Sequence, residues 1–138
     1  MIRGLAAVVA GLVAWSIVAV VVNLAFRAAW PGYAEVEPSM RFTLAMMFAR
    51  LGLGALSSVC GGIVAARVAK GSELPVRTLG IVLVAMFVPI HYGLWDRFPV
   101  WYHLTFLFSL LPLTLVGASL APRVDRSARL DTLRTNVL

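Results

Sequence analysis

The chain has 138 residues, of which 61% are hydrophobic and 13% charged, and its formal net charge is +6 at pH 7. Soluble domains usually carry about 25% charged residues, so this composition excludes a water-soluble globular protein. The basic residues lie beside apolar segments, where they face phospholipid headgroups, and we therefore expect no nucleic-acid partner. The single cysteine, Cys60, excludes an internal disulfide.

Four apolar segments follow one another at residues 4–26, 42–66, 78–95 and 98–122, with 23, 25, 18 and 25 residues. A helix needs about 20 apolar residues to cross a hydrocarbon core of about 30 Å. Short connections make sequential helices antiparallel neighbours. We therefore predict an all-α fold, an integral-membrane four-helix antiparallel bundle that occupies residues 1–122.

The first predicted helix contains Asn23 near its end and no acidic residue. Small multidrug exporters use a membrane-embedded glutamate in their first helix, so this chain departs from that family. The connection that follows contains Pro31, Gly32 and Pro38, which favour turns and predict a short external loop.

The second predicted helix carries small residues at every fourth position, namely Gly54, Ser58, Gly62 and Ala66. Small side chains let helix backbones approach closely, which favours helix association in lipid. The stripe predicts close packing, either within the bundle or at a subunit interface.

Arg50 lies four residues before Gly54 on the same face, about 12 Å from the start of this helix. A charge at that depth costs roughly 2.5 to 3.5 kcal/mol and needs partners, so we expect Arg50 to point into the bundle. Each proline inside the last two helices frees a carbonyl four residues earlier, and we predict that Arg50 bonds one of these carbonyls, at Ala85 or Phe108. The alternatives are an inward-folded carboxylate (Glu35, Glu37 or Asp96) or a bound anion.

Polar and aromatic residues collect towards the same end of the bundle as Arg50. We predict that they form a ligand-binding pocket with it, comprising Asn23, His91, Tyr92, Asp96, Trp101, Tyr102 and His103. His91 and His103 stand on opposite arms of the last hairpin and are expected to approach one another. Two facing imidazoles can ligate haem or a metal, although no third ligand motif accompanies them. No nucleophile motif accompanies the histidines either, so we expect no enzyme and no resident cofactor.

Residues 123–138 form a basic tail, which we expect to be either an amphipathic helix on the membrane surface or disordered. Basic residues flank the two sides of the bundle unequally, so both termini are predicted to be cytoplasmic. Eight lie on the predicted cytoplasmic side (Arg3, Arg67, Lys70, Arg77, Arg123, Arg126, Arg129 and Arg134) and three on the other (Arg27, Arg41 and Arg97). Six aromatic residues fall on the opposite side, where we expect an interfacial belt: Trp30, Tyr33, Tyr92, Trp95, Trp101 and Tyr102.

The chain resembles small multi-pass proteins of bacterial inner membranes as a class. We predict a non-enzymatic accessory or oligomerising subunit, whose outward-facing pocket around Arg50 binds a partner, a lipid headgroup or a small ligand. Its expected partners are membrane lipids, with anionic headgroups at the cytoplasmic face, and further membrane subunits. One alternative is a transporter or channel for a small anion or lipid-linked substrate, and another is a redox protein that uses His91 and His103.

Overall fold

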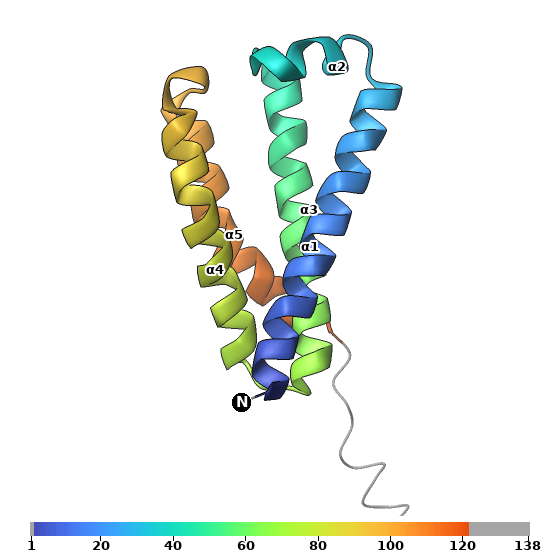
Figure 1. Cartoon of the computed structure of the whole chain (residues 1–138), viewed down its shortest axis with the longest axis vertical. Coiled ribbons are helices and arrows are strands. Elements are labelled where there is room, and N and C mark those ends of the chain that lie inside the picture. The colour runs from blue at the N-terminus through green and yellow to red at the C-terminus, as the bar shows by residue number, and fades with distance from the viewer. Residues whose placement is uncertain (1, 122–138) are drawn as a thin grey trace, which may run out of the picture.

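The fold is a bundle of α-helices, seen in a computed structural model that describes residues 2–121 (Figure 1). The α-helices in this range are α1 (Ile2–Ala29), α2 (Tyr33–Val36), α3 (Leu44–Ala69), α4 (Leu74–Gly93) and α5 (Val100–Leu120). Single 3-10 turns follow α2 (Glu37–Ser39) and α4 (Trp95–Arg97). The four long helices are apolar and long enough to cross a membrane, which indicates a multi-pass membrane protein. The predicted all-α bundle of four long apolar helices is thus confirmed, whereas the predicted tail lies outside the described residues.

The helix ends follow local chemistry more than the limits of the apolar segments. Thr43 caps α3 by accepting a hydrogen bond from the Met46 amide at 3.3 Å. Helix α4 begins four residues before the predicted segment, because Pro75 fits the first turn of a helix. The connection from α3 to α4 turns through Lys70 and Gly71, which both have positive φ.

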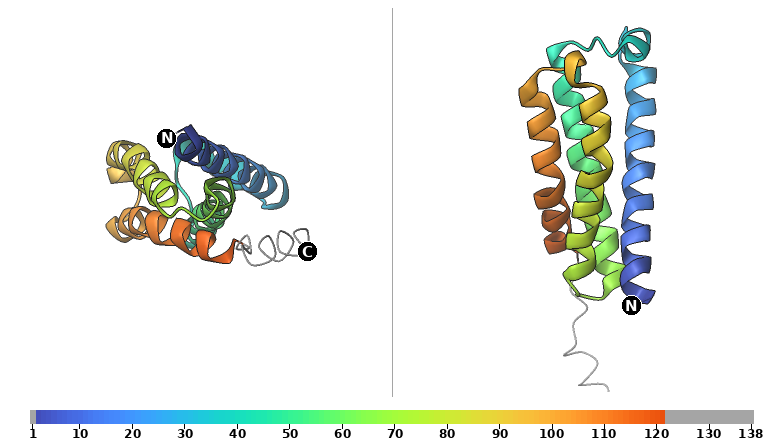
Figure 2. Two further views of the ribbon diagram at one scale, coloured as in Figure 1. Left: turned by 90° about the horizontal axis from the view of Figure 1, so that it is seen from below. Right: turned by 60° about the vertical axis from the view of Figure 1, so that its left-hand side comes forward.

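Helix α3 is the centre of the bundle and contacts all three other long helices, as Figures 1 and 2 show. A Cβ on Gly61 would lie 2.9 Å from the Gly11 carbonyl oxygen of α1. A Cβ on Gly62 would collide with the Thr114 carbonyl oxygen of α5. The small residues therefore let α3 approach a neighbour on each side, and this close packing takes place within one chain.

The bundle is not packed evenly along its length. Helices α1 and α4 lie close together at the end that holds the N-terminus and diverge towards the other end (Figure 1). Trp15, Leu79, Leu83 and Leu110 belong to the main hydrophobic core. A second cluster lies nearer the other end, where Tyr33 and Phe42 pack with residues of α3 and α5.

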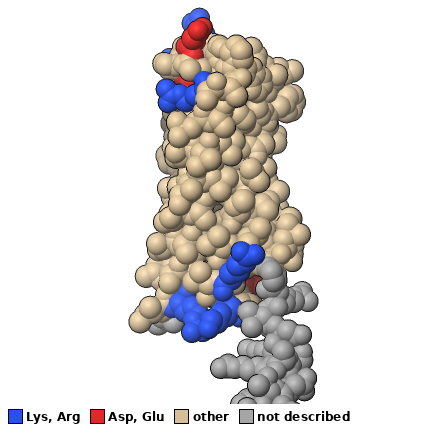
Figure 3. Space-filling model, turned by 90° about the vertical axis from the view of Figure 1, so that its right-hand side faces the viewer, with Lys and Arg blue, Asp and Glu red and all other residues tan. Residues whose placement is uncertain are grey.

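Charge separates the two ends of the molecule (Figure 3). The end that we call the basic end carries four basic residues and one acidic residue: Arg3, Arg67, Lys70, Arg77 and Glu73. The opposite end, here the mixed-charge end, carries basic and acidic residues together: Arg27, Glu35, Glu37, Arg41, Asp96 and Arg97. The surface between them is almost free of charge on the face drawn, as expected for helices in contact with lipid.

Candidate functional site

A cleft of about 390 Å³ opens between the diverging helices at the mixed-charge end. We call it the Arg50 cleft. Its polar wall is formed by residues of α1, α3, α5 and the first 3-10 turn: Asn23, Arg27, Glu37, Arg50 and Tyr102. Its apolar wall includes Trp15, Leu53, Phe87 and Phe106. The volume lies in the range of small-molecule sites, which is about 300 to 1,000 Å³.

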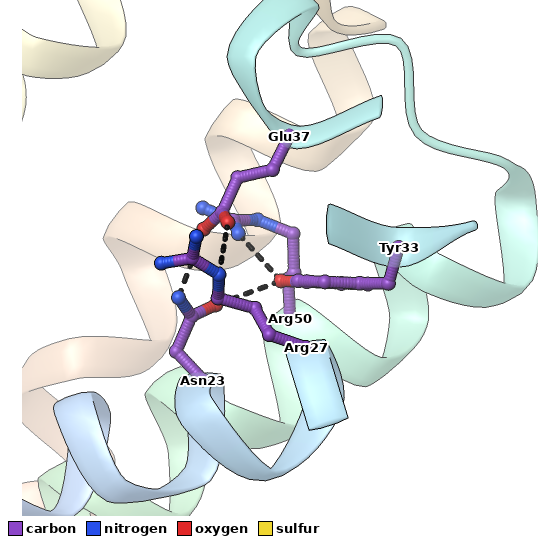
Figure 4. A network of polar contacts seen from close by, with 5 residues as sticks. All are labelled: Asn23, Arg27, Tyr33, Glu37 and Arg50. Carbon is purple, nitrogen blue, oxygen red and sulfur yellow. Dashed lines mark hydrogen bonds and ion pairs between the residues drawn. The ribbon is translucent and has the colours of Figure 1, made fainter. Parts of the chain in front are cut away.

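Five side chains form a continuous set of polar contacts along one side of the cleft (Figure 4). Arg50 Nη1 donates to the Tyr33 hydroxyl at 2.8 Å, and this hydroxyl donates to Asn23 Oδ1 at 2.9 Å. Asn23 Nδ2 donates to Glu37 Oε1 at 2.8 Å. Arg27 Nε lies 3.3 Å from Glu37 Oε2, which completes what we call the polar network.

Tyr33 reaches Arg50 because the connection after α1 folds back over the bundle. Gly32 adopts a φ of 77°, which turns the chain so that α2 begins at Tyr33. The Tyr33 side chain is fully buried and packs against Phe26 and Phe42. The Arg50 guanidinium lies over the Phe42 ring, 4.5 Å from its centroid, which adds a cation–π contact.

The partner of Arg50 differs from the one predicted from sequence. Among the described residues, Arg50 hydrogen bonds the Tyr33 hydroxyl and neither the Ala85 nor the Phe108 carbonyl, so that prediction is wrong. The physical reason is that α2 brings a hydroxyl group directly to the guanidinium. Glu37 does fold inward, but it bonds Asn23 and Arg27 rather than Arg50.

The polar network has more positive than negative charge. Two arginines and one glutamate give it a formal charge of +1, and within residues 2–121 no carboxylate lies within ion-pair distance of Arg50. Arg50 Nε is buried and has no hydrogen-bond partner among the described residues. Arg50 also lines the cleft, and a guanidinium without a carboxylate partner among the described residues is suited to receive an anion there.

The two histidines contact each other directly, with their Nδ1 atoms 2.8 Å apart. At this distance one imidazole donates a proton and the other accepts it. Two nitrogen ligands of a tetrahedral metal would lie about 3.3 Å apart, so a metal between these atoms requires the rings to move. No group of three or more potential metal ligands occurs within residues 2–121.

The histidine pair is enclosed by aromatic rings and lies behind the cleft wall. His103 stacks on Trp95 with centroids 4.8 Å apart, and His91 stacks on Phe106 at 4.7 Å. His103 Nε2 is buried without a partner among the described residues. Since Phe106 lines the cleft, it separates the pair from the cleft rather than leaving it open to a ligand.

The sequence-predicted site residues thus fall into three groups. Arg50, Asn23 and Tyr102 line the cleft. His91 and His103 are buried beside it. The remaining three residues are exposed and do not line it: Tyr92, Asp96 and Trp101.

Sequence reasoning missed three residues that matter at this site. Tyr33 was expected in the interfacial belt but is buried, as is Tyr102. Arg27 was counted only for orientation, although it lies four residues after Asn23 and hence on the same helix face. Glu37 was considered only as a partner of Arg50. The four-residue spacing of Asn23 and Arg27 was the sequence signal that could have placed Arg27 at the site.

Comparison with known proteins gives no relative from which a function could be transferred. No protein-family model matches the chain, and no curated protein or solved structure matches it significantly. The four long apolar helices are what indicates the class, a multi-pass membrane protein.

Proposed function

We propose that this chain is a non-enzymatic membrane protein that binds an anionic group in the Arg50 cleft. The observation that carries the proposal is the guanidinium of Arg50, which lines the cleft without a carboxylate partner among the described residues. A buried or half-buried cation needs a counter-charge, and a bound anion supplies it. The Tyr33 hydroxyl holds the guanidinium in place for this role.

We further propose that the protein lies in an inner membrane of bacterial type with both termini in the cytoplasm. The sequence supports this orientation, because eight basic residues are predicted to flank one side of the bundle and three the other, and positively charged connections are retained on the cytoplasmic side. The Arg50 cleft then lies in the outer half of the membrane.

We also propose that the chain acts as an accessory subunit of a membrane assembly. The make-up of the chain supports this role, because most of the described residues lie in the four candidate spans and the connections between them are short. The stripe on α3 adds no evidence for a dimer, because α1 and α5 occupy it. Mass measurement in a gentle detergent tests this part, and a strictly monomeric protein without partners would contradict it.

The transporter alternative has less support from the geometry. Below the cleft, α1 packs closely on α3 and α4, with Gly11 against Gly61 and Leu79. Trp15 and Phe87 also meet across the cleft, with ring centroids 5.0 Å apart. An anion bound at Arg50 would have to pass this contact to cross the membrane. The redox alternative requires the bonded histidines to separate.

The experiment is a thermal-denaturation series on the purified protein in a neutral detergent. The added anions are inorganic phosphate, glycerol 3-phosphate and phosphatidylglycerol, and the neutral control lipid is phosphatidylcholine. At least one anion should raise the denaturation temperature of the native protein and of Arg41→Gln, which removes an exposed charge at the same end. Arg50→Gln should lose this stabilisation. Equal stabilisation of both variants would contradict the proposal.

A further inference from the structure

We infer that the anion in the Arg50 cleft is the phosphate headgroup of a membrane lipid, whose acyl chain lies along the lower part of the cleft. The upper part is the part at the mixed-charge end, and the lower part is the part farther from it. This inference rests on the proposed function and names its ligand class. A free phosphate offers the same headgroup chemistry, but it has no acyl chain to occupy the rest of the cleft.

The depth of the cleft matches one leaflet. Its lining extends along α1 from Arg27 to Trp15, which are 12 residues and hence about 18 Å apart. One leaflet contributes about 15 Å of a hydrocarbon core that is about 30 Å thick. A soluble anion bound at Arg50 would occupy only the upper part of this length.

The polarity of the cleft changes along its depth in the way that a lipid requires. The charged groups lie at the upper part, on Arg27, Glu37 and Arg50. The lower part is lined by aromatic rings, and Phe87 contacts both Trp15 and Phe106, at 5.0 and 5.1 Å between ring centroids. These rings offer an apolar surface on which an acyl chain can pack, and they offer nothing to a hydrated anion.

The cleft is also open towards the lipid. Val20 and Leu24 line it and are exposed over 57% and 53% of their surfaces, so the cleft is not closed off along α1. The side chain of Arg27 is 52% exposed at the upper rim. A lipid can therefore enter sideways from the leaflet, with its headgroup moving between Arg27 and Arg50.

The charge at the upper part selects an anionic headgroup. The polar network has a formal charge of +1, and Arg50 lines the cleft without a carboxylate partner among the described residues. Arginine binds phosphate oxygens through two parallel hydrogen bonds, so a phosphate fits this environment. A lipid with net negative charge, such as phosphatidylglycerol, is favoured over zwitterionic phosphatidylcholine with the same chains.

The test compares two alanines of α1 that differ in position. Ala19 lines the lower cleft, whereas Ala25 is exposed and does not line it. Ala19→Leu fills the acyl-chain part and leaves the polar network unchanged, and Ala25→Leu adds the same volume elsewhere. Retention of phosphatidylglycerol and phosphatidylcholine is measured by native mass spectrometry, and binding of glycerol 3-phosphate, the soluble headgroup analogue, is measured by calorimetry.

The native protein and Ala25→Leu should retain phosphatidylglycerol over phosphatidylcholine. Ala19→Leu should retain at least tenfold less phosphatidylglycerol while binding glycerol 3-phosphate as the native protein does. If Ala19→Leu retains the lipid like Ala25→Leu, the inference fails, although anion binding at Arg50 stands. If Arg50→Gln and Arg50→Lys, folded as judged by gel filtration, retain every anion like the native protein, the proposed function fails as well.

Discussion

The hydroxyl of Tyr33 accepts a hydrogen bond from Arg50 Nη1 at 2.8 Å and joins α2 to α3 across 17 residues of sequence. The same hydroxyl donates to Asn23 on α1. One phenol therefore connects three helices at the mixed-charge end. It also fixes the guanidinium on the wall of the cleft.

Tyr33→Phe should lower the free energy of unfolding by about 1 to 3 kcal/mol, because it leaves Arg50 and Asn23 with unpaired polar groups. Tyr92→Phe is the matched control, since Tyr92 is 80% exposed and should change stability by less than about 0.5 kcal/mol. The measurement is the denaturation midpoint of each variant in neutral detergent. Equal midpoints for the two variants would contradict the role of the Tyr33 hydroxyl.

Two glycines of α3 allow a matched test of helix packing. Gly62→Ala places a methyl group against the Thr114 carbonyl and should destabilise the bundle by about 2 kcal/mol or more, because backbone must move. Gly52 has no atom within 4 Å of an added Cβ, so Gly52→Ala should be neutral or stabilising by about 0.5 to 1 kcal/mol. Unfolding of both variants in mixed micelles measures the difference. A stable Gly62→Ala protein would show that α3 and α5 are less closely packed.

The spans could be predicted from sequence because apolar length alone determines which segments cross a membrane. The close packing of another helix at Gly62 also follows from sequence, because small residues recur at every fourth position of α3. The partner of Arg50 could not be predicted, because it depends on how the connection through Gly32 folds Tyr33 inward. An aromatic residue near a membrane boundary is usually interfacial, and only the three-dimensional arrangement reveals that Tyr33 is buried.

The approach of His91 and His103 followed from their positions on the two arms of one hairpin, and they lie in contact. Their relation to the cleft could not be predicted, because it depends on the Phe106 side chain that separates them from it. The position of Asp96 relative to the cleft could not be predicted either, since Asp96 shares the histidines' end of the bundle but is exposed.

A double-mutant cycle should reveal the bond between the two histidines. Replacing either His91 or His103 by Phe leaves a buried ring nitrogen unpaired, whereas replacing both removes the donor and the acceptor together. The double variant should therefore lose less unfolding free energy than the two single variants lose in sum, by about 0.5 to 1.5 kcal/mol. Strictly additive effects on the unfolding free energy would argue against the bond.

The orientation is tested by cysteine labelling in a Cys60→Ala background, which removes the only native thiol. Ser39→Cys lies in the connection at the mixed-charge end, and Ser72→Cys lies in the connection at the basic end; both positions are exposed. A membrane-impermeant maleimide added to intact cells should label the first and spare the second. The reverse pattern would place the Arg50 cleft in the cytoplasmic leaflet.

The most direct test of anion binding observes the Arg50 guanidinium itself. Nuclear magnetic resonance of arginine Nε–H groups in nanodiscs compares phosphatidylcholine discs with discs that also contain phosphatidylglycerol. We predict that the Arg50 resonance shifts when the anionic lipid is present, because Arg50 lines the cleft without a carboxylate partner among the described residues. Arg41, which is exposed outside the cleft, should change little. An Arg50 resonance that is identical in both discs would contradict the account.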